Sequence, residues 1–190
     1  MSHDDILELF RSINVLRQGH FHLTSGRHSD RFLLCSQLTM HPEATERIVN
    51  EIAVKVVASG VQPNLIIGPA MGGIILAYEL ARILGCRAMF AEKEGDGMAM
   101  KRGFVLQETD KVLIIEDAVS TGGSVRKVVD IVEASPAELV GVAVLIDRTM
   151  GQLCFGDVPF ISLLQMQIDS WTAEECPLCQ QGVPLVYPKA

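Results

Sequence analysis

The sequence predicts an α/β fold in which helices flank a mainly parallel central sheet. Short apolar runs alternate with segments of helical periodicity from residue 42 to residue 148. Strands joined in this way by crossover helices form parallel sheets. The chain has 190 residues, 48% of them apolar, which is enough for one domain with a sizeable core and too little for two full ones.

The N-terminal quarter has helical and hairpin patterns. Apolar residues at helical spacing predict a helix over residues 4–17, ended by Gly19. The run FHLTSGRHSDRFLLC then predicts two short strands around a Ser-Gly turn. A second helix is expected to start at Pro42 and to stop at Gly60.

The alternating elements follow from residue 65 onward. We expect strands at 65–70, 87–91, 111–117 and 138–148, helices at 72–84 and 124–134, a polar loop at 92–103, and one further strand within 160–168. Ligands of such sheets bind beyond the carboxyl ends of the strands. Three motifs lie there: GPAMGG, EDAVSTGGS and DRT.

Several classes of protein are disfavoured. The formal net charge of −7 argues against nucleic acid held on a broad basic face. No apolar run approaches the roughly 20 residues that span a bilayer, and the N-terminus has no secretion signal. We therefore expect a cytoplasmic protein that binds neither nucleic acid nor membrane.

The five cysteines predict reduced, mostly packed thiols and no disulfide framework. Cys176 and Cys179 form a C-x2-C pair, which supplies only two of the four ligands of a structural zinc. A tight turn is the favoured interpretation, and a zinc shared across a dimer is the alternative. His20, His22 and His28 lie close together in the sequence; because no spaced acids accompany them, exposed residues are favoured over a metal site, which is the alternative.

The segment Ser120–Ser124 combines hydroxyl groups with two glycines at a predicted helix start. The plain alternative is a strand-to-helix turn with Ser124 as N-cap. Backbone N–H groups at such a start, together with the helix dipole, favour an anion, and glycine lets a ligand approach closely. The lysine of a P-loop is missing. We interpret the segment as a cradle for a monophosphate.

Glu116 and Asp117 immediately precede this cradle. Two carboxylates facing a phosphate would repel it, but they are suited to accept hydrogen bonds from neighbouring neutral hydroxyls. The stretch Val112–Val125 is therefore predicted to hold a ribose 5-phosphate, with the sugar on the acids and the phosphate on the loop.

VLIIEDAVSTGGS resembles the 5-phosphoribosyl-1-pyrophosphate (PRPP) signature of the type I phosphoribosyltransferases. FHLTSGRHSDRF, GPAMGG, FAEKEGDGMAMKRGF, IDRT and ECPLCQQGVPLV resemble bacterial orotate phosphoribosyltransferases, in particular the branch with a CPLC tail. The resemblance implies one domain, 1–190, in which residues 1–40 and the C-terminal tail form a hood over a core at 41–165. It implies transfer of ribose 5-phosphate from PRPP to orotate with Mg²⁺, a step of pyrimidine biosynthesis, by a homodimer.

The resemblance also assigns roles to residues. Lys93 and Asp117 would be catalytic, Lys101 and Arg102 would belong to a mobile lid that completes the neighbouring subunit's site, and Ser120 and Arg148 would bind orotate. The PRPP-binding residues would be Lys93, Glu116, Asp117, Ala118, Val119, Ser120, Thr121, Gly122, Gly123 and Ser124. The pyrophosphate loop would be Ala70, Met71, Gly72 and Gly73. Mg²⁺ would be carried by PRPP, with Glu116 and Asp117 in its outer shell and no direct protein ligand.

This chain departs from the family pattern at three places. Residues 68–73 lack a lysine that some members carry, and Asp96, Gly97 and Met98 stand where the lid often has lysine and histidine. Thr24 stands where many relatives have a hood lysine; either Arg27 or Arg31 supplies that charge, or this branch functions without it. Arg148 is suited to the orotate carboxylate through its guanidinium fork; the alternative is a surface cation paired with Asp147.

Two other functions stay open at this point. A purine phosphoribosyltransferase would offer its base an aromatic face and an acid, whereas a cation follows the strand here. A PRPP-sensing regulator without activity would need a nucleic-acid-binding element, and the sequence contains neither a helix-turn-helix pattern nor a basic face.

Overall fold

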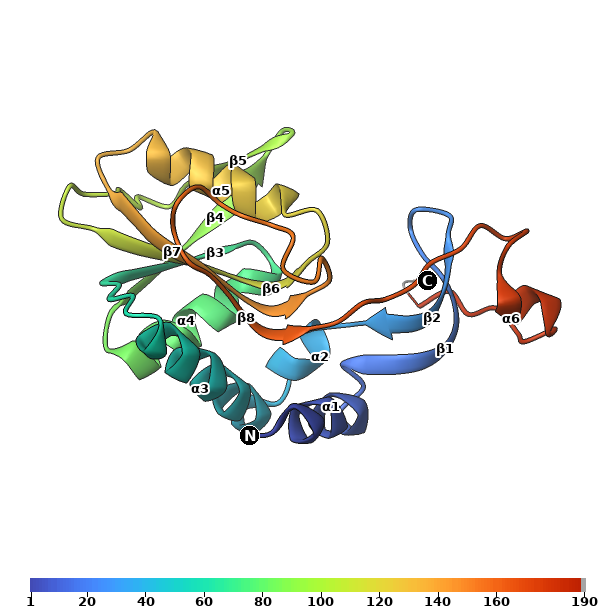
Figure 1. Cartoon of the computed structure of the whole chain (residues 1–190). Helices are drawn as coiled ribbons and strands as arrows, with labels where there is room; N and C mark the ends of the chain where they lie inside the picture. Colours follow the sequence, from blue (N-terminus) through green and yellow to red (C-terminus); the bar gives the residue numbers. More distant parts are fainter. Residues whose placement is uncertain (189–190) are drawn as a thin grey trace. The chain divides into compact units, whose positions relative to one another are not determined.

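Six strands form one sheet, in the order β5-β4-β3-β6-β7-β8. We describe residues 1–188 of a computed structural model (Figure 1). The strands are β3 (Leu65–Pro69), β4 (Arg87–Glu94), β5 (Gly97–Met100), β6 (Lys111–Val119), β7 (Glu138–Asp147) and β8 (Phe160–Gln165). All neighbouring pairs are parallel except β4 and β5. The predicted fold class is confirmed.

Three helices cover the two faces of this sheet. α3 (Pro42–Ala58) and α4 (Gly72–Leu84) pack against each other on one face, and α5 (Gly123–Glu133) covers the other (Figure 1). Every residue of β3 is buried, as expected for a strand with helices on both sides. The sheet and these helices form one compact unit, residues 41–166, which we call the sheet unit.

Residues 1–40 and the segment from Gln167 onward form a second compact unit, which we call the hairpin unit. Its elements are α1 (His3–Ser12), β1 (Leu16–His22), β2 (His28–Leu33), α2 (Ser36–Thr39) and α6 (Pro177–Gln180). β1 and β2 form an antiparallel pair. Isolated bridges join Phe21 to Val186 and His28 to Trp171, so the C-terminal segment is attached to both strands of the hairpin.

The first predicted helix is too long. It ends at Ser12, and Leu16, expected on the helix, begins β1 instead. Asn14 adopts a positive φ of 59°, a conformation that asparagine tolerates better than most residues and that ends a helix. Gly19, the expected stop, lies within β1 at an irregularity of the strand register.

The polar loop expected at 92–103 is also wrong in part. β4 continues to Glu94, and β5 returns antiparallel to it, with Lys93 paired with Met98. The segment GDGM forms the turn of a β-hairpin and the first two residues of β5. Gly95 supplies the positive φ (55°) of this tight connection. The other strands and helices of the sheet unit lie within a few residues of their predicted positions.

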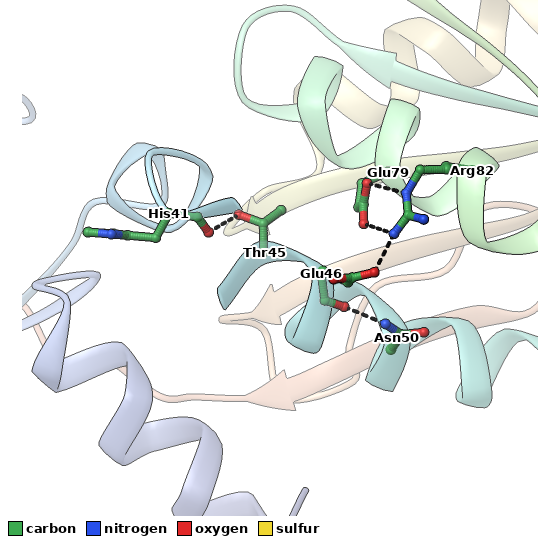
Figure 2. A network of polar contacts seen from close by, with 6 residues as sticks. All are labelled: His41, Thr45, Glu46, Asn50, Glu79 and Arg82. Carbon is green, nitrogen blue, oxygen red and sulfur yellow. Dashed lines mark hydrogen bonds and ion pairs between the residues drawn. The ribbon is translucent and has the colours of Figure 1, made fainter. Parts of the chain in front are cut away.

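Polar contacts join α3 to α4 on the sheet unit (Figure 2). Arg82 of α4 donates to Glu79, one turn earlier, and to Glu46 of α3, at 2.6–3.0 Å. Thr45 and Asn50 hydrogen-bond to carbonyls of the preceding turn, at His41 and Glu46.

Among residues 1–188, no helix combines the length and apolarity needed to cross a bilayer.

Candidate active site

A cavity of about 290 Å³ opens where β6 ends and α5 begins. It is lined by Glu116, Ala118, Val119, Ser120, Thr121, Gly122, Gly123, Ser124, Val125 and Lys127. All five residues of the predicted phosphate cradle therefore line one hollow. The first N–H groups of α5 have no partner within the helix, and together with the helix dipole they favour an anion in this place.

The backbone of this loop depends on Gly122. It is the N-cap of α5 in the left-handed conformation, with φ of 74°, and no side chain caps the helix. Ser124 is thus not the N-cap, which leaves its hydroxyl group at the cavity. A β-carbon at Gly122 would lie 3.1 Å from both Leu153 and Phe155, so packing and backbone conformation both favour glycine here.

The two acids at the end of β6 have different surroundings. Glu116 lines the cavity although it is only 8% exposed, and the Asp117 N–H donates to its carboxylate at 3.1 Å. Burial, followed by the neighbouring Asp117 charge, raises the pKa of Glu116 to about 8, although that hydrogen bond opposes the shift. Glu116 is therefore largely protonated at neutral pH.

Asp117 faces the turn of the GPAMGG motif. A β-carbon at Gly72 would lie 2.4 Å from Asp117 Oδ2, and one at Gly68 would lie 2.1 Å from the Gly73 carbonyl oxygen. These glycines thus let the end of β3, the start of α4 and the end of β6 approach one another more closely than side chains permit. Ala70 and Met71, in the same turn, are joined by a cis peptide bond.

Arg148 follows β7 beside the cavity loop. Its backbone N–H donates at 2.9 Å to the carbonyl of Val119, the residue before Ser120. Its Nε is buried without a hydrogen-bond partner among residues 1–188. Asp147 accepts instead from the Thr149 N–H and hydroxyl and from the Gly151 N–H. The alternative of a surface pair between Arg148 and Asp147 is therefore wrong.

The cations of the predicted lid lie on the β4–β5 hairpin and just after it. Lys101 forms an ion pair with Glu94 at 3.3 Å, and Arg102 donates to Glu92 at 2.6 Å. The Arg102 hydrogen bond lowers the pKa of Glu92, so this pair is charged at neutral pH. Lys93 is exposed on β4.

The phosphoribosyl transferase domain model matches residues 36–154. An orotate phosphoribosyltransferase of Heliobacterium modesticaldum is 47% identical over 99% of this chain and 98% of its own length. The chain belongs to the orotate phosphoribosyltransferase family. The resemblance that the sequence motifs indicated is confirmed at this level.

Solved structures of phosphoribosyltransferases share the fold at low identity. An orotate phosphoribosyltransferase from Aeropyrum pernix is 18% identical, with a TM-score of 0.65 over 84% of this chain and 93% of its own. An adenine phosphoribosyltransferase from Leishmania tarentolae is 20% identical, with a TM-score of 0.62 over 87% and 89%. Enzymes for a pyrimidine and for a purine share this architecture, so the fold alone does not select the base.

One cavity residue of this family member was missed by the sequence analysis. Lys127 lines the cavity, and its ammonium group donates to the Asp96 carbonyl in the turn of the β4–β5 hairpin. It lies four residues after Gly123, so it shares the helix face that begins at the cradle. That spacing was a usable signal. Lys127 brings positive charge to this cavity.

The two arginines considered as replacements for the hood lysine have partners within the hairpin unit. Arg27 donates from Nε to the Ser170 hydroxyl at 2.9 Å and from Nη2 to the Ser170 carbonyl. Arg31 lies 3.5 Å from the Asp30 carboxylate. Arg27 therefore ties the turn between β1 and β2 to the C-terminal segment.

Proposed function

We propose that this chain transfers ribose 5-phosphate from PRPP to N1 of orotate, releasing pyrophosphate and forming orotidine 5′-monophosphate. Membership of the orotate phosphoribosyltransferase family supports the reaction class. The observation that carries the choice of base is the buried, unpaired Nε of Arg148 beside the cavity loop. A buried guanidinium N–H without an acceptor is costly, and the carboxylate of orotate would supply that acceptor in a charge-assisted, two-point contact.

The cavity residues would hold the ribose phosphate. The 5-phosphate would accept hydrogen bonds from the backbone N–H groups and hydroxyls of Ser120–Ser124, with Lys127 at the same cavity. The two ribose hydroxyls would donate to Glu116 and Asp117. This arrangement keeps the anionic phosphate on the helix N-terminus and the neutral hydroxyls on the acids.

Catalysis would rest on positioning and on stabilising the leaving group. The bond from the anomeric carbon to the pyrophosphate oxygen breaks as the bond to orotate N1 forms, the N1 proton passes to the departing pyrophosphate or to water, and the chain supplies no covalent nucleophile. The turn at Ala70–Gly73 would hold the pyrophosphate through backbone N–H groups, and Lys93, Lys101 and Arg102 would add positive charge from the β4–β5 hairpin. Preorganised donors and cations of this kind lower the barrier to losing an anion.

Mg²⁺ fits the donors present. Glu116 and Asp117 provide the hard oxygen atoms that this ion prefers, and the ion usually keeps several waters between itself and protein carboxylates. When bound with PRPP it would neutralise charge on the pyrophosphate. We also infer a homodimer, in which Lys101 and Arg102 after the β4–β5 hairpin would serve the neighbouring site; this rests on family resemblance. A cytoplasmic location is inferred from composition.

An assay with several bases tests this function. The protein is incubated with PRPP and Mg²⁺ together with orotate, uracil or adenine, and the loss of each base is followed by its absorbance. We expect turnover with orotate alone. Turnover with adenine, or PRPP binding without turnover on any base, would contradict the proposal.

Variants of Arg148 sharpen the same test. Arg148→Gln should raise the KM for orotate by about 10²-fold, because a charge-assisted contact to a buried carboxylate contributes roughly 2–5 kcal/mol. The KM for PRPP should change little. Arg82→Gln, on α4 and paired with Glu46 and Glu79, is the matched control and should leave both constants unchanged. An Arg148→Gln enzyme with an unaltered KM for orotate would remove Arg148 from the base site.

A further inference from the structure

Two histidines and two cysteines gather in the hairpin unit, and none of them is among the residues assigned to transfer. His20 lies on β1 and His28 on β2, while Cys176 and Cys179 belong to the turn that contains α6 (Figure 1). One ligand atom from each of the four lies within 4.8 Å of every other. The expectation of exposed histidines is wrong for His20 and His28, which are buried. The C-x2-C pair lies in a turn, as expected, and its sulfur atoms lie against these two histidines.

Four of the six distances in this cluster lie near the edge lengths of a metal-centred tetrahedron. His20 Nε2 lies 3.0 Å from His28 Nδ1 and 3.4 Å from Cys176 Sγ, and Cys179 Sγ lies 3.2 Å from His28 Nδ1 and 3.7 Å from His20 Nε2. With zinc–nitrogen bonds of about 2.0 Å and zinc–sulfur bonds of about 2.3 Å, ligand atoms of a tetrahedral site are about 3.3–3.8 Å apart. The widest pair would need to close by about 1 Å.

The orientation of His20 is also suited to a metal. Its Nδ1 lies 2.8 Å from the Val183 carbonyl oxygen, an acceptor that fixes the proton on Nδ1 and leaves the Nε2 lone pair for a cation. Metal-binding histidines usually make such a second hydrogen bond. His20 is 2% exposed and Cys176 is fully buried, whereas Cys179 is exposed. Cys179 therefore gives an ion a path into an otherwise enclosed site.

We propose that His20, His28, Cys176 and Cys179 bind one Zn²⁺ ion as a closed structural site. Two thiolates and two imidazoles in a tetrahedron favour zinc over Mg²⁺ or Ca²⁺, which prefer oxygen atoms. Four protein ligands leave no open position for substrate, so the ion has no part in transfer chemistry.

The site joins parts of the chain that are far apart in sequence. Cys176 and His20 are separated by 156 positions, and the ion would bind the C-terminal segment to both strands of the β1–β2 hairpin. A unit this small buries little apolar surface, and small units commonly rely on a metal or disulfides. The inference does not depend on orotate transfer.

Metal analysis of the purified protein tests the proposal directly. Protein expressed in zinc-supplemented medium and washed free of loose metal should contain about one zinc per chain, as a four-ligand site predicts. X-ray absorption should give two sulfur neighbours at about 2.3 Å and two nitrogen neighbours at about 2.0 Å. Replacement by Co²⁺ should produce the intense visible bands of tetrahedral coordination and a thiolate-to-cobalt charge-transfer band.

Matched variants identify the ligands. Cys176→Ser and His20→Ala should lose most of the zinc, whereas Cys154→Ser and His22→Ala should keep it. Cys154 is an exposed thiol of the sheet unit, and His22 lies on the same strand as His20 but outside the cluster. Because a ligand variant could fail to fold, zinc is also removed from the wild-type protein with a chelator. Hydrogen exchange should then increase at residues 16–33 and 167–188 and remain unchanged in α4.

Three results would overturn the proposal. The first is a wild-type protein that, under reducing conditions, neither contains zinc nor takes up Zn²⁺ or Co²⁺. The second is equal zinc content in Cys176→Ser and Cys154→Ser. The third is an absorption spectrum with only nitrogen and oxygen neighbours. None of these measurements uses PRPP or orotate, so they leave the transfer reaction untouched.

Discussion

In the sheet unit, the strands that lead to the cavity are buried along most of their length, whereas in the hairpin unit β1 and β2 are only partly buried. The sheet unit is held by apolar packing and by backbones in close contact, as at Gly68 and Gly73. The hairpin unit is joined to its C-terminal segment by polar contacts, such as those of Arg27 with Ser170 and of His20 with Val183.

Substitutions that add atoms to a packed region and substitutions that remove a surface contact should therefore differ in their effect on stability. Apolar packing restricts the backbone of the sheet unit, so a small added group there has a large effect. Side-chain contacts at a surface contribute less each, and their loss is more easily tolerated. Within the sheet unit, we therefore expect the largest effect where backbones are in close contact and the smallest at an exposed ion pair.

The largest effect is expected for Gly68→Ala. The new methyl group would lie 2.1 Å from the Gly73 carbonyl oxygen, so the end of β3 and the start of α4 would have to separate. We expect a loss of about 3–4 kcal/mol in the free energy of unfolding, measured by denaturant titration. Gly97→Ala is the control, because its β-carbon would meet only the Glu94 carbonyl at 3.5 Å. Equal stability of the two variants would mean that this close contact is not required.

Asp117→Asn should reduce turnover strongly without unfolding the protein. Asparagine keeps the shape of the side chain but replaces the carboxylate that would accept a hydrogen bond from a ribose hydroxyl. A loss of about 10²–10³-fold in kcat/KM for PRPP is expected, the range found when a transition-state contact is removed. Asp130→Asn, at an exposed position of α5, should retain full activity. Unaltered turnover of Asp117→Asn would exclude the assignment of Asp117 to the ribose.

Glu116→Gln should change how stability depends on pH. Folding raises the pKa of Glu116 to about 8, so the folded state holds a proton that the unfolded state has released from about pH 4.5 upward. Wild-type stability therefore falls between about pH 5 and pH 8 through this group. The glutamine variant lacks this loss, so from pH 5 to pH 9 its free energy of unfolding should rise by about 5 kcal/mol relative to that of wild type.

Thermal unfolding from pH 5 to pH 9 measures this difference. Glu133→Gln, which is exposed at the end of α5, serves as control and should follow the wild-type curve. Parallel curves for Glu116→Gln and wild type would show that Glu116 titrates normally in the folded protein. The same group would lose its proton when ribose hydroxyls bind, which calorimetry in buffers of different ionisation enthalpy detects.

The smallest effect is expected for Arg82→Ala. Arg82 contacts Glu46 and Glu79 (Figure 2), but half of its side chain is exposed. Exposed ion pairs contribute about 0.2–1 kcal/mol each and are screened by salt. We expect a loss of at most about 1 kcal/mol, which shrinks at high salt. A larger, salt-independent loss would show that α3 and α4 depend on this network more than on apolar packing.

Much of the sheet unit could be predicted from the sequence because its signals are local. The run Val112–Ile115 is apolar enough to mark a buried strand, and Gly122 and Gly123 mark the turn into α5 within a few residues. The segment Ser120–Ser124 lies together at one cavity for the same reason. Lys127 was missed although its spacing placed it on the helix face at the cradle.

The errors fall where long-range contacts decide the structure. Apolar spacing alone extended the first helix through Leu16, but Leu16 pairs with Leu33 in the β1–β2 hairpin. The polar composition of residues 92–103 favoured a loop, but pairing of β5 with β4 made it a hairpin.

The sequence by itself determined the parallel sheet, the glycine turn into α5 and the position of the paired acids. Each of these depends on hydrophobic periodicity and on glycines within one strand-turn-helix segment, which neighbouring residues specify. Only the tertiary structure decided that Arg148 Nε is buried without a partner and that His20 and His28 meet Cys176 and Cys179. Those contacts join residues far apart in the chain, and no local pattern encodes the distance between them.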